Sequence, residues 1–556
     1  MSAKQRAMVA ALLLFVAAVV AFMVVPASAQ LTDVTRTTNP IGEGICKSFP
    51  QEVGAGRGNI FTPDSSIFII NRDPFRSIRR GRQVFQRKFA RVQGQGPAVD
   101  DAFGDISVDP NPRRAAGLAD SCAACHGRPR GSAGFGGNVF TRPDSRDSPH
   151  LFGLGLKEMI ADEMSKGLRK LRDTAIQQAQ QTGLPVVAIL TVKGVNFGSI
   201  TAFPNGTVDT SNVQGVNPDL RIRPFRLDGR FIAIREFVID AFQNEMGMQA
   251  VDPDTLAASL GNFVTTPAGM ELNGKEDVIQ GPPVQNSSQD GDGDGVANEI
   301  PSSIVDFEEH YLLNYFLAGR GEITKEVEQG RDYFKEIGCT SCHRPDFQID
   351  RDRRVGTFDT HFEPNPAISN PFNRLFVDVT PLFNEVDDGT GHPKLKVPKF
   401  LPFTAEAIYT DFKRHDLGSN FWEIQFNGLV NKQFLTMALH GVGTTAPYGH
   451  DGRSHDLREV ILRHGGEAQE ARDNFESMGP EKQPYVLAFL RSLILFPPDD
   501  TPSTLQGITP GCIGLQKARD NLCFDPFVNT SQVRYPQCGH GSIKLGMLFN
   551  NPTDPE

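Results

Sequence analysis

Two short stretches of the chain have residue types and a spacing that suit redox chemistry: Cys-Ala-Ala-Cys-His at residues 122–126 and Cys-Thr-Ser-Cys-His at residues 339–343. In each, two thiols are spaced to add to the two vinyl groups of one haem, and the histidine that follows can ligate its iron. The alternative is a pair of redox or zinc half-sites, but zinc needs four ligands in one place and the two pairs lie far apart in sequence. The motifs predict two covalent c-type haems, attached through Cys122, Cys125, Cys339 and Cys342 and ligated by His126 and His343.

The elements that must hold these motifs occur twice along the chain. A Gly-Arg-x-x-Phe pattern begins at Gly81 and again at Gly330, ahead of each motif. An Asp-Gly-Arg triplet, followed at the same distance by x-Arg-Glu, begins 102 residues after the first motif histidine and 108 residues after the second. This repeated order argues for duplication of one haem-binding unit. We expect each unit to be mainly helical, because short helices wrap a c-type haem with their apolar faces.

Apolar periodicity and stop signals predict a series of helices and one small sheet. The expected helices span residues 79–89, 156–182, 231–242, 254–263, 304–317, 325–337, 405–414, 457–463 and 481–495. Between 185 and 208, alternating β-branched residues around Pro204-Asn205-Gly206 predict a small β-hairpin inserted in the first unit. The predicted fold class is mainly α, with two cytochrome c-like haem domains in tandem at residues 30–319 and 320–500.

Residues 1–29 have the pattern of an export signal. Lys4 and Arg6 precede an apolar run over residues 8–25, and the small residues 27–29 fit a cleavage site. An uncleaved membrane anchor is the alternative, since the run is just long enough to span a bilayer. Removing the signal changes the formal net charge from −10 to −12, which disfavours nucleic acid as a partner. The sequence therefore predicts a periplasmic or secreted protein without stable membrane insertion.

Four cysteines lie outside the haem motifs, namely Cys46, Cys512, Cys523 and Cys538. An even set of thiols in an oxidising compartment favours disulfides. Because three of the four lie in the last 45 residues, at least one bridge is expected to pin the tail at residues 501–556. Three pairings are open.

An acidic loop lies between the two motifs. Asp290, Asp292 and Asp294 alternate with glycines as oxygen ligands do in a calcium loop, although Pro301 stands where a complete EF-hand has glutamate. The pattern predicts a calcium site, and an acidic solvated turn is the alternative.

In this order, the motifs resemble those of the bacterial di-haem cytochrome c peroxidases, with their relatives MauG and the di-haem oxidoreductases once called thiol oxidoreductases. The resemblance is closest to the last branch and covers about residues 81–495. The stretches that carry it are residues 81–89, 93–97, 121–127, 151–156, 244–248, 409–411, 415–418, 445–453 and 462–468.

The resemblance implies a peroxidase-like oxidoreductase. In this family the N-terminal haem is reactive, the C-terminal haem relays electrons, and a carboxylate over the first haem is the acid–base group. The string Asn-Glu-Met-Gly at residues 244–247 is similar to the stretch that bears that carboxylate, which makes Glu245 the candidate. Such a group can move a proton between the two oxygens of peroxide. A surface glutamate at a helix end is the alternative.

The resemblance also bears on the remaining iron ligands. His464 lies where the family places the distal ligand of its second haem, and His440 and His450 are the alternatives. His150 is a candidate displaceable ligand of the first haem, or else a loop histidine satisfied by other hydrogen bonds. The family binds calcium between its haem units, which agrees with the acidic loop. One position departs from the family pattern, because Leu227 stands where the peroxidases and MauG carry a tryptophan before Asp-Gly-Arg.

The predicted substrate is peroxide or dioxygen, and the predicted partner is a small soluble electron-transfer protein of cytochrome c or cupredoxin type. Two other functions stay open. One is a non-catalytic di-haem electron-transfer cytochrome in which protein ligands saturate both irons. The other is a haem oxygenase acting on an apolar organic substrate, for which 40 Phe against 7 Tyr is a faint indication.

Overall fold

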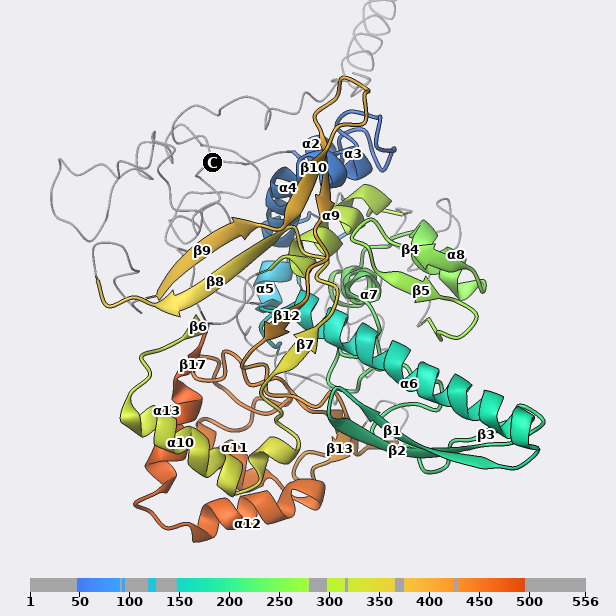
Figure 1. Ribbon diagram of the computed structural model, residues 1–556. Helices are drawn as coiled ribbons and strands as arrows, with labels where there is room; N and C mark the ends of the chain where they lie inside the picture. The colour runs from blue at the N-terminus through green and yellow to red at the C-terminus, as the bar shows by residue number, and fades with distance from the viewer. Residues whose placement is uncertain are drawn as a thin grey trace, which may run out of the picture.

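The computed structural model of the chain describes residues 48–90, 93–95, 119–126, 148–279, 298–315, 319–365, 375–424 and 429–495 (Figure 1). The expected signal, the calcium-loop residues Asp290, Asp292 and Asp294, the cysteines Cys46, Cys512, Cys523 and Cys538, and the tail from residue 501 lie outside these ranges. No helix of the described ranges combines the length and apolar character that crossing a membrane requires.

The described helices are α2 (Phe49–Val53), α3 (Ser66–Arg72), α4 (Pro74–Gln86), α5 (Cys122–His126), α6 (Leu154–Thr182), α7 (Ile234–Met246), α8 (Pro253–Ser259), α9 (Ser302–Leu313), α10 (Lys325–Glu336), α11 (Leu457–Arg463), α12 (Gln469–Ser477) and α13 (Gln483–Arg491). The strands of the first half and its border are β1 (Val186–Val192), β2 (Val195–Ala202), β3 (Val208–Asp209), β4 (Phe263–Thr265), β5 (Glu271–Asn273) and β6 (Gly319–Arg320). Those of the second half are β7 (Phe347–Ile349), β8 (Gly356–Phe362), β9 (Leu375–Pro381), β10 (Phe383–Val386), β11 (Leu395–Pro398), β12 (Phe403–Ala405), β13 (Arg414–Asp416), β14 (Glu423–Ile424), β15 (Val430–Asn431), β16 (Gln433–Leu435) and β17 (Leu493–Ile494).

A close helix pair frames each haem motif. In the first unit α4 crosses α9 at Gly81, where an added Cβ would lie 2.2 Å from the carbonyl oxygen of Phe307. In the second unit α10 crosses α13 at Gly330, where an added Cβ would lie 1.9 Å from the carbonyl oxygen of Tyr485. Only glycine permits such contacts, which explains the repeated Gly-Arg pattern.

The Asp-Gly-Arg triplets form matching turns. A β-bridge between Phe225 and Phe231 closes the first turn, and one between Tyr448 and Ser454 closes the second. The triplet glycines have φ angles of 62° and 64°. The next helix, α7 or α11, begins six residues after the triplet aspartate in both units. These shared details are what duplication of one unit predicts.

A long helix and a small sheet join the two halves. The helix α6 ends as predicted at Gly183, whose φ of 69° suits glycine. The inserted sheet differs from the expected hairpin. It has three strands, its first turn lies at residues 193–194, and the Pro-Asn-Gly segment at 204–206 makes the second turn. The apolar face of α6 packs on β1 and β2 and also on β7 and β12 of the second half, so the halves share a core (Figure 1).

The second half departs most from the sequence expectation. A helix was predicted over residues 405–414, but β12 ends at Ala405 and β13 begins at Arg414, so this prediction is wrong. Ala407, Tyr409 and Phe412 between them have φ angles of 58°, 57° and 61°, which a right-handed helix cannot contain. Hydrogen bonds to the segment after the second haem motif hold this irregular backbone instead. The backbone N–H of Ile408 donates to the carbonyl oxygen of Pro345 at 2.7 Å, and that of Thr410 to the carbonyl oxygen of Arg344 at 3.0 Å.

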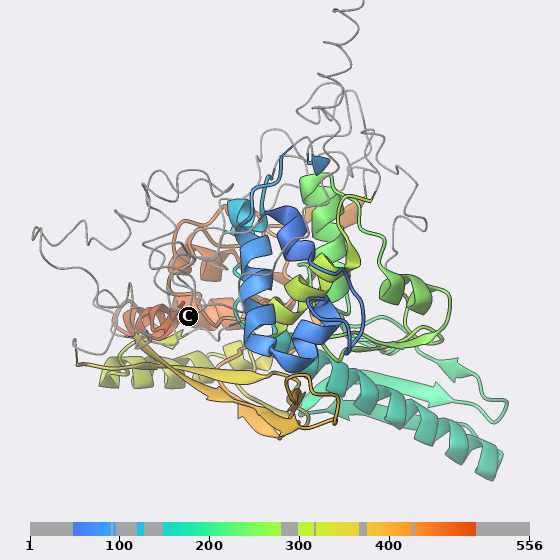
Figure 2. The ribbon, with the colours of Figure 1, turned by 90° about the horizontal axis from the view of Figure 1, so that it is seen from above.

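A strand-rich segment of the second half crosses to the first. The β10–β11 hairpin lies against α3 and α4 (Figure 2). Arg72 of α3 donates to Asp388 and to the carbonyl oxygen of Pro393, each at 2.5 Å, and the rings of Phe75 and Phe383 meet at 5.9 Å. The second half therefore supports the helix pair that frames the first haem motif.

Arg235 of α7 supplies a test of this architecture. The buried guanidinium pairs with three buried carboxylates, those of Asp252, Asp306 and Glu309. We expect Arg235→Met to lower the free energy of unfolding by about 3–5 kcal/mol, because three charges lose their buried partner. Chemical denaturation followed by circular dichroism measures this loss. The matched control is Arg458→Met, since the exposed Arg458 holds the same place in the second unit and should change stability by less than about 0.5 kcal/mol. Equal losses would contradict the assignment of the network.

Candidate haem sites

The first motif is a short helix, α5, that packs beside α4. Nδ1 of His126 lies 2.7 Å from the carbonyl oxygen of Pro149. Because a carbonyl only accepts, Nδ1 carries the proton and Nε2 keeps the lone pair that a metal ligand needs. Burial lowers the pKa of His126 to about 4, so the ring is neutral, as metal binding requires.

The second motif has the same arrangement. Nδ1 of His343 donates to the carbonyl oxygen of Tyr409 at 3.1 Å, and burial lowers the pKa of the ring to about 4. Each motif histidine also lies near the phenylalanine of its Gly-Arg-x-x-Phe pattern. The ring centroids of His126 and Phe85 are 6.3 Å apart, and those of His343 and Phe334 are 6.2 Å apart. Both imidazoles are therefore oriented by backbone and packing, with Nε2 left for a ligand.

The four motif thiols fit haem attachment better than zinc or disulfide exchange. None of Cys122, Cys125, Cys339 and Cys342 is in a disulfide. Burial raises the pKa of Cys125 to about 11 and that of Cys339 to about 12. Within the described ranges, the single group of three close metal-ligand side chains is Cys342 with Asp411 and His415. That group lacks the four ligands of a structural zinc site.

His464 has the geometry of a second ligand at the second site. Its Nδ1 donates to the carbonyl oxygen of Val460 at 2.7 Å, which leaves Nε2 available. His464 is close to His343: burial lowers the pKa of the His343 ring, and His464 lowers it further. The ring of His450 instead stacks on Phe434 at 4.5 Å.

His150 and His440 lie at the contact between the halves. Nε2 of His150 donates to the carbonyl oxygen of His440 at 2.7 Å, and its Nδ1 accepts from the backbone N–H of Phe152 at 3.2 Å. Nε2 of His440 donates to the carbonyl oxygen of Phe152 at 2.8 Å. His150 thus has the features of the satisfied loop histidine, with both ring nitrogens in use.

Glu245 is exposed at the last turn of α7. Its carboxylate is close enough to the first motif to influence it: burial raises the pKa of Cys125, and the charge of Glu245 raises it further. The sequence reasoning missed Asp240, one turn earlier on α7. Burial raises the pKa of Asp240 to about 6, and Glu245 adds to the effect. Asn244 donates to the carboxylate of Asp240 at 2.6 Å. Because Asp240 and Glu245 are five residues apart and do not share a helix face, their spacing gave no signal of a paired site.

A second missed residue is Glu308 on α9. It is 1% exposed, and neither of its carboxylate oxygens has a hydrogen-bond partner within the described part of the chain. Burial and the nearby Glu52 raise the pKa of Glu308 well above the ordinary value. Burial also raises the pKa of the Cys122 thiol, and the nearby Glu308 raises it further. The matched helix crossings put Val486 at this place in the second unit. At this position the first site therefore has a carboxyl group and the second an aliphatic side chain.

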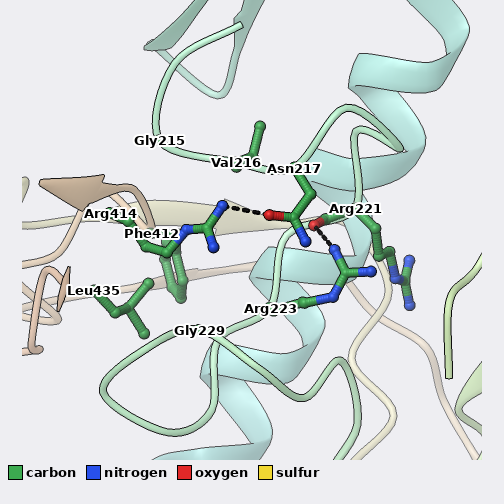
Figure 3. Close-up of a pocket in the computed structure, with 9 residues that line it drawn as sticks. All are labelled: Gly215, Val216, Asn217, Arg221, Arg223, Gly229, Phe412, Arg414 and Leu435. Carbon is green, nitrogen blue, oxygen red and sulfur yellow. Dashed lines mark hydrogen bonds between the residues drawn. The ribbon is translucent and has the colours of Figure 1, made fainter. Parts of the chain in front are cut away.

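The first Asp-Gly-Arg turn touches the second half. The carbonyl oxygen of Leu227 accepts from the backbone N–H of Leu435 at 2.7 Å. A small pocket beside this contact is lined by Gly215, Val216, Asn217, Arg221, Arg223, Gly229, Phe412, Arg414 and Leu435 (Figure 3). Arg414 donates to the side-chain oxygen of Asn217 at 2.5 Å. The position of the family tryptophan thus lies between the halves, at a basic contact, and an aliphatic side chain fills it here.

No curated protein matches the chain. Residues 384–493 match the family model described as "Di-haem oxidoreductase, putative peroxidase". The match lies in the second half and includes His464 and the second Asp-Gly-Arg turn. It implies haem binding and an oxidoreductase function, and with it the chain's resemblance to the di-haem oxidoreductase branch is confirmed.

Proposed function

We propose that this chain is an exported di-haem c-type cytochrome that acts as a peroxidase-like oxidoreductase. Its first haem would be attached at Cys122 and Cys125 and its second at Cys339 and Cys342, as tandem cytochrome c-like units. When bound, haem supplies iron that can bind peroxide and exchange single electrons. The substrate would be peroxide or dioxygen, and a small soluble cytochrome c or cupredoxin would exchange electrons at the second site.

The observation that carries this proposal is the chemical difference between two sites of the same construction. His464 lies near His343, and its Nε2 is available as the sixth ligand of a haem iron, which would make the second haem an electron relay. The neighbour of His126 is His150, whose ring nitrogens are both engaged. Among the described residues, the first site has Glu308 where the second has Val486. The second site has His464 and, beside Cys342, the pair of Asp411 and His415. An open, acid-lined site suits peroxide, and a saturated one suits electron relay.

The carboxyl groups on α7 are suited to proton transfer at the first site. Cleavage of peroxide requires that a proton leave one oxygen and reach the departing one. Glu245 is accessible to solvent, and Asp240, with a pKa of about 6, can hold or release a proton near neutral pH. Burial and the nearby Glu52 raise the pKa of Glu308, which favours the neutral form of this carboxyl near Cys122. Glu245 is the group assigned to the proton transfer.

Peroxide turnover by the purified, half-reduced holoprotein tests the function. With a competent one-electron donor present, peroxide should be consumed and the donor oxidised in proportion. A holoprotein that contains two haems but does not react with peroxide would overturn the peroxidase proposal.

The relay assignment predicts a spectral change in His464→Gly. Loss of the imidazole should convert the second haem from low-spin to high-spin or water-bound, because its sixth ligand is gone. Absorption and electron paramagnetic resonance spectra measure the change. The matched control is His450→Gly, which should leave the spin state unaltered. A low-spin second haem in His464→Gly would contradict the assignment.

A further inference from the structure

The two motif histidines are joined by one chain of hydrogen bonds through the protein. At the first site His126 donates to the carbonyl oxygen of Pro149 at 2.7 Å. The next residue is His150, whose side chain reaches into the second half and donates to the carbonyl oxygen of His440 at 2.7 Å. The proximal-ligand loop of the first site is thus hydrogen-bonded directly to the second unit.

The connection continues on the far side of this contact. The backbone N–H of Leu439, the neighbour of His440, donates to the carbonyl oxygen of Ile408 at 3.1 Å. Ile408 is bonded to Tyr409, whose carbonyl oxygen accepts from Nδ1 of His343 at 3.1 Å. Each hydrogen bond has ordinary length, and short covalent segments connect them. The irregular backbone at residues 406–413 is what places both carbonyl groups.

The link is fixed in place by a reciprocal hydrogen bond. His440 donates back from Nε2 to the carbonyl oxygen of Phe152 at 2.8 Å, and the rings of His150 and His440 meet edge-on at 4.9 Å. Burial lowers the pKa of both rings, so each is neutral and has one N–H. The side chain of His150 lies on the connecting route. The side chain of His440 makes the return bond and also interacts with the backbone of Ile408, while its own backbone carbonyl is on the route.

We propose that His150 is the positioning residue through which electrons pass between the two haem sites. From the second site to the first, the route runs through His343, Tyr409, Ile408, Leu439, His440, His150, Pro149 and His126. This rests on the proposed function. The transfer moves one electron from the reduced second site to the oxidised first site. Peroxide is the final oxidant and the soluble donor protein the reductant, and no proton moves along the route.

The chemistry of the route supports this role. The tryptophan that the related peroxidases carry before the first Asp-Gly-Arg triplet is Leu227 here, and an aliphatic side chain offers no π-system between the sites. Hydrogen bonds to the outer nitrogen of an iron-bound imidazole also tune the metal and are sensitive to replacement. The route ends at such a hydrogen bond at both motif histidines.

The test measures electron redistribution and not turnover. The oxidised holoprotein is reduced by one electron in a radiolysis pulse, and the separate absorption bands of the two haems report the transfer. His150→Phe keeps a ring at the contact but removes the N–H on the route. We expect the inter-haem rate to fall by about 10-fold, the lower end of what outer-shell hydrogen bonds contribute at metal sites. The control is His455→Phe, the same substitution at an exposed histidine of the second unit that is not on the route, and its rate should stay near that of the wild type. His150→Gln retains an N–H donor and should recover part of the rate.

The outcomes separate the inference from the function it rests on. A rate that is unchanged in His150→Phe, or that falls equally in His455→Phe, overturns the route and leaves the peroxidase proposal standing. A wild-type holoprotein without two distinguishable haems overturns both. Slow transfer confined to His150→Phe, with the equilibrium spectra of both haems unaltered and partial recovery in His150→Gln, supports the route.

Discussion

Glu245→Gln is expected to lower peroxide-dependent turnover by about 100- to 10,000-fold, the range that one positioned acid–base group contributes. The amide keeps the shape of the side chain but cannot take up the proton that peroxide cleavage moves. Because the side chain is exposed at the end of α7, the variant should fold normally, and the haem content should be unchanged. Steady-state peroxide consumption by the half-reduced holoprotein measures the effect.

Two further variants define what the Glu245 result means. Asp240→Asn removes the neighbouring carboxyl group whose pKa is about 6. A large loss in Asp240→Asn with little loss in Glu245→Gln would transfer the acid–base role to Asp240. Glu470→Gln, an exposed change on α12, is the control and should leave turnover unaltered.

Replacing Cys122 and Cys125 together with alanine is expected to remove one covalent haem from the protein and to leave the other attached. The two motifs lie in separate helix pairs, α4 with α9 and α10 with α13, so the second site should still assemble. Intact-protein mass spectrometry gives the expected loss of one haem mass. The reciprocal variant, with Cys339 and Cys342 replaced, should lose the other haem.

A wild-type chain, produced where c-type haems are attached, whose mass equals that of the bare polypeptide would exclude covalent attachment at either motif. The chain would then be left with four half-buried thiols and two half-buried, neutral histidines.

The regular elements followed from local sequence signals where those signals were strong. The helices α10 and α11 begin at predicted residues because Thr324 and Asp456 cap them, and α6 ends at a glycine with left-handed backbone. The helix prediction for residues 405–414 was wrong. The apolar residues of this segment suit a helix, but its backbone is hydrogen-bonded to the loop after the second motif. Such a contact between distant segments leaves no periodic trace in the sequence.

The candidate sites were predictable to different degrees. The motif cysteines and histidines could be identified from their spacing, and His464 from its position after the second Asp-Gly-Arg turn. Glu308 and Asp240 were missed, because a carboxylate on a helix is ordinarily a solvent-exposed group and only packing reveals its burial. The joining of His150 to His440 could not be predicted either, since 290 residues separate the two partners.

Electron paramagnetic resonance of the purified holoprotein, oxidised and half-reduced, tests the central claim most directly. A peroxidase-like di-haem protein with an open first site and a relay at the second should show two distinct irons. In the half-reduced state the iron at the Cys122/Cys125/His126 site should be accessible to an added ligand. Two low-spin irons that stay saturated in both states, and that bind no added ligand, would contradict the claim and leave a cytochrome that only relays electrons.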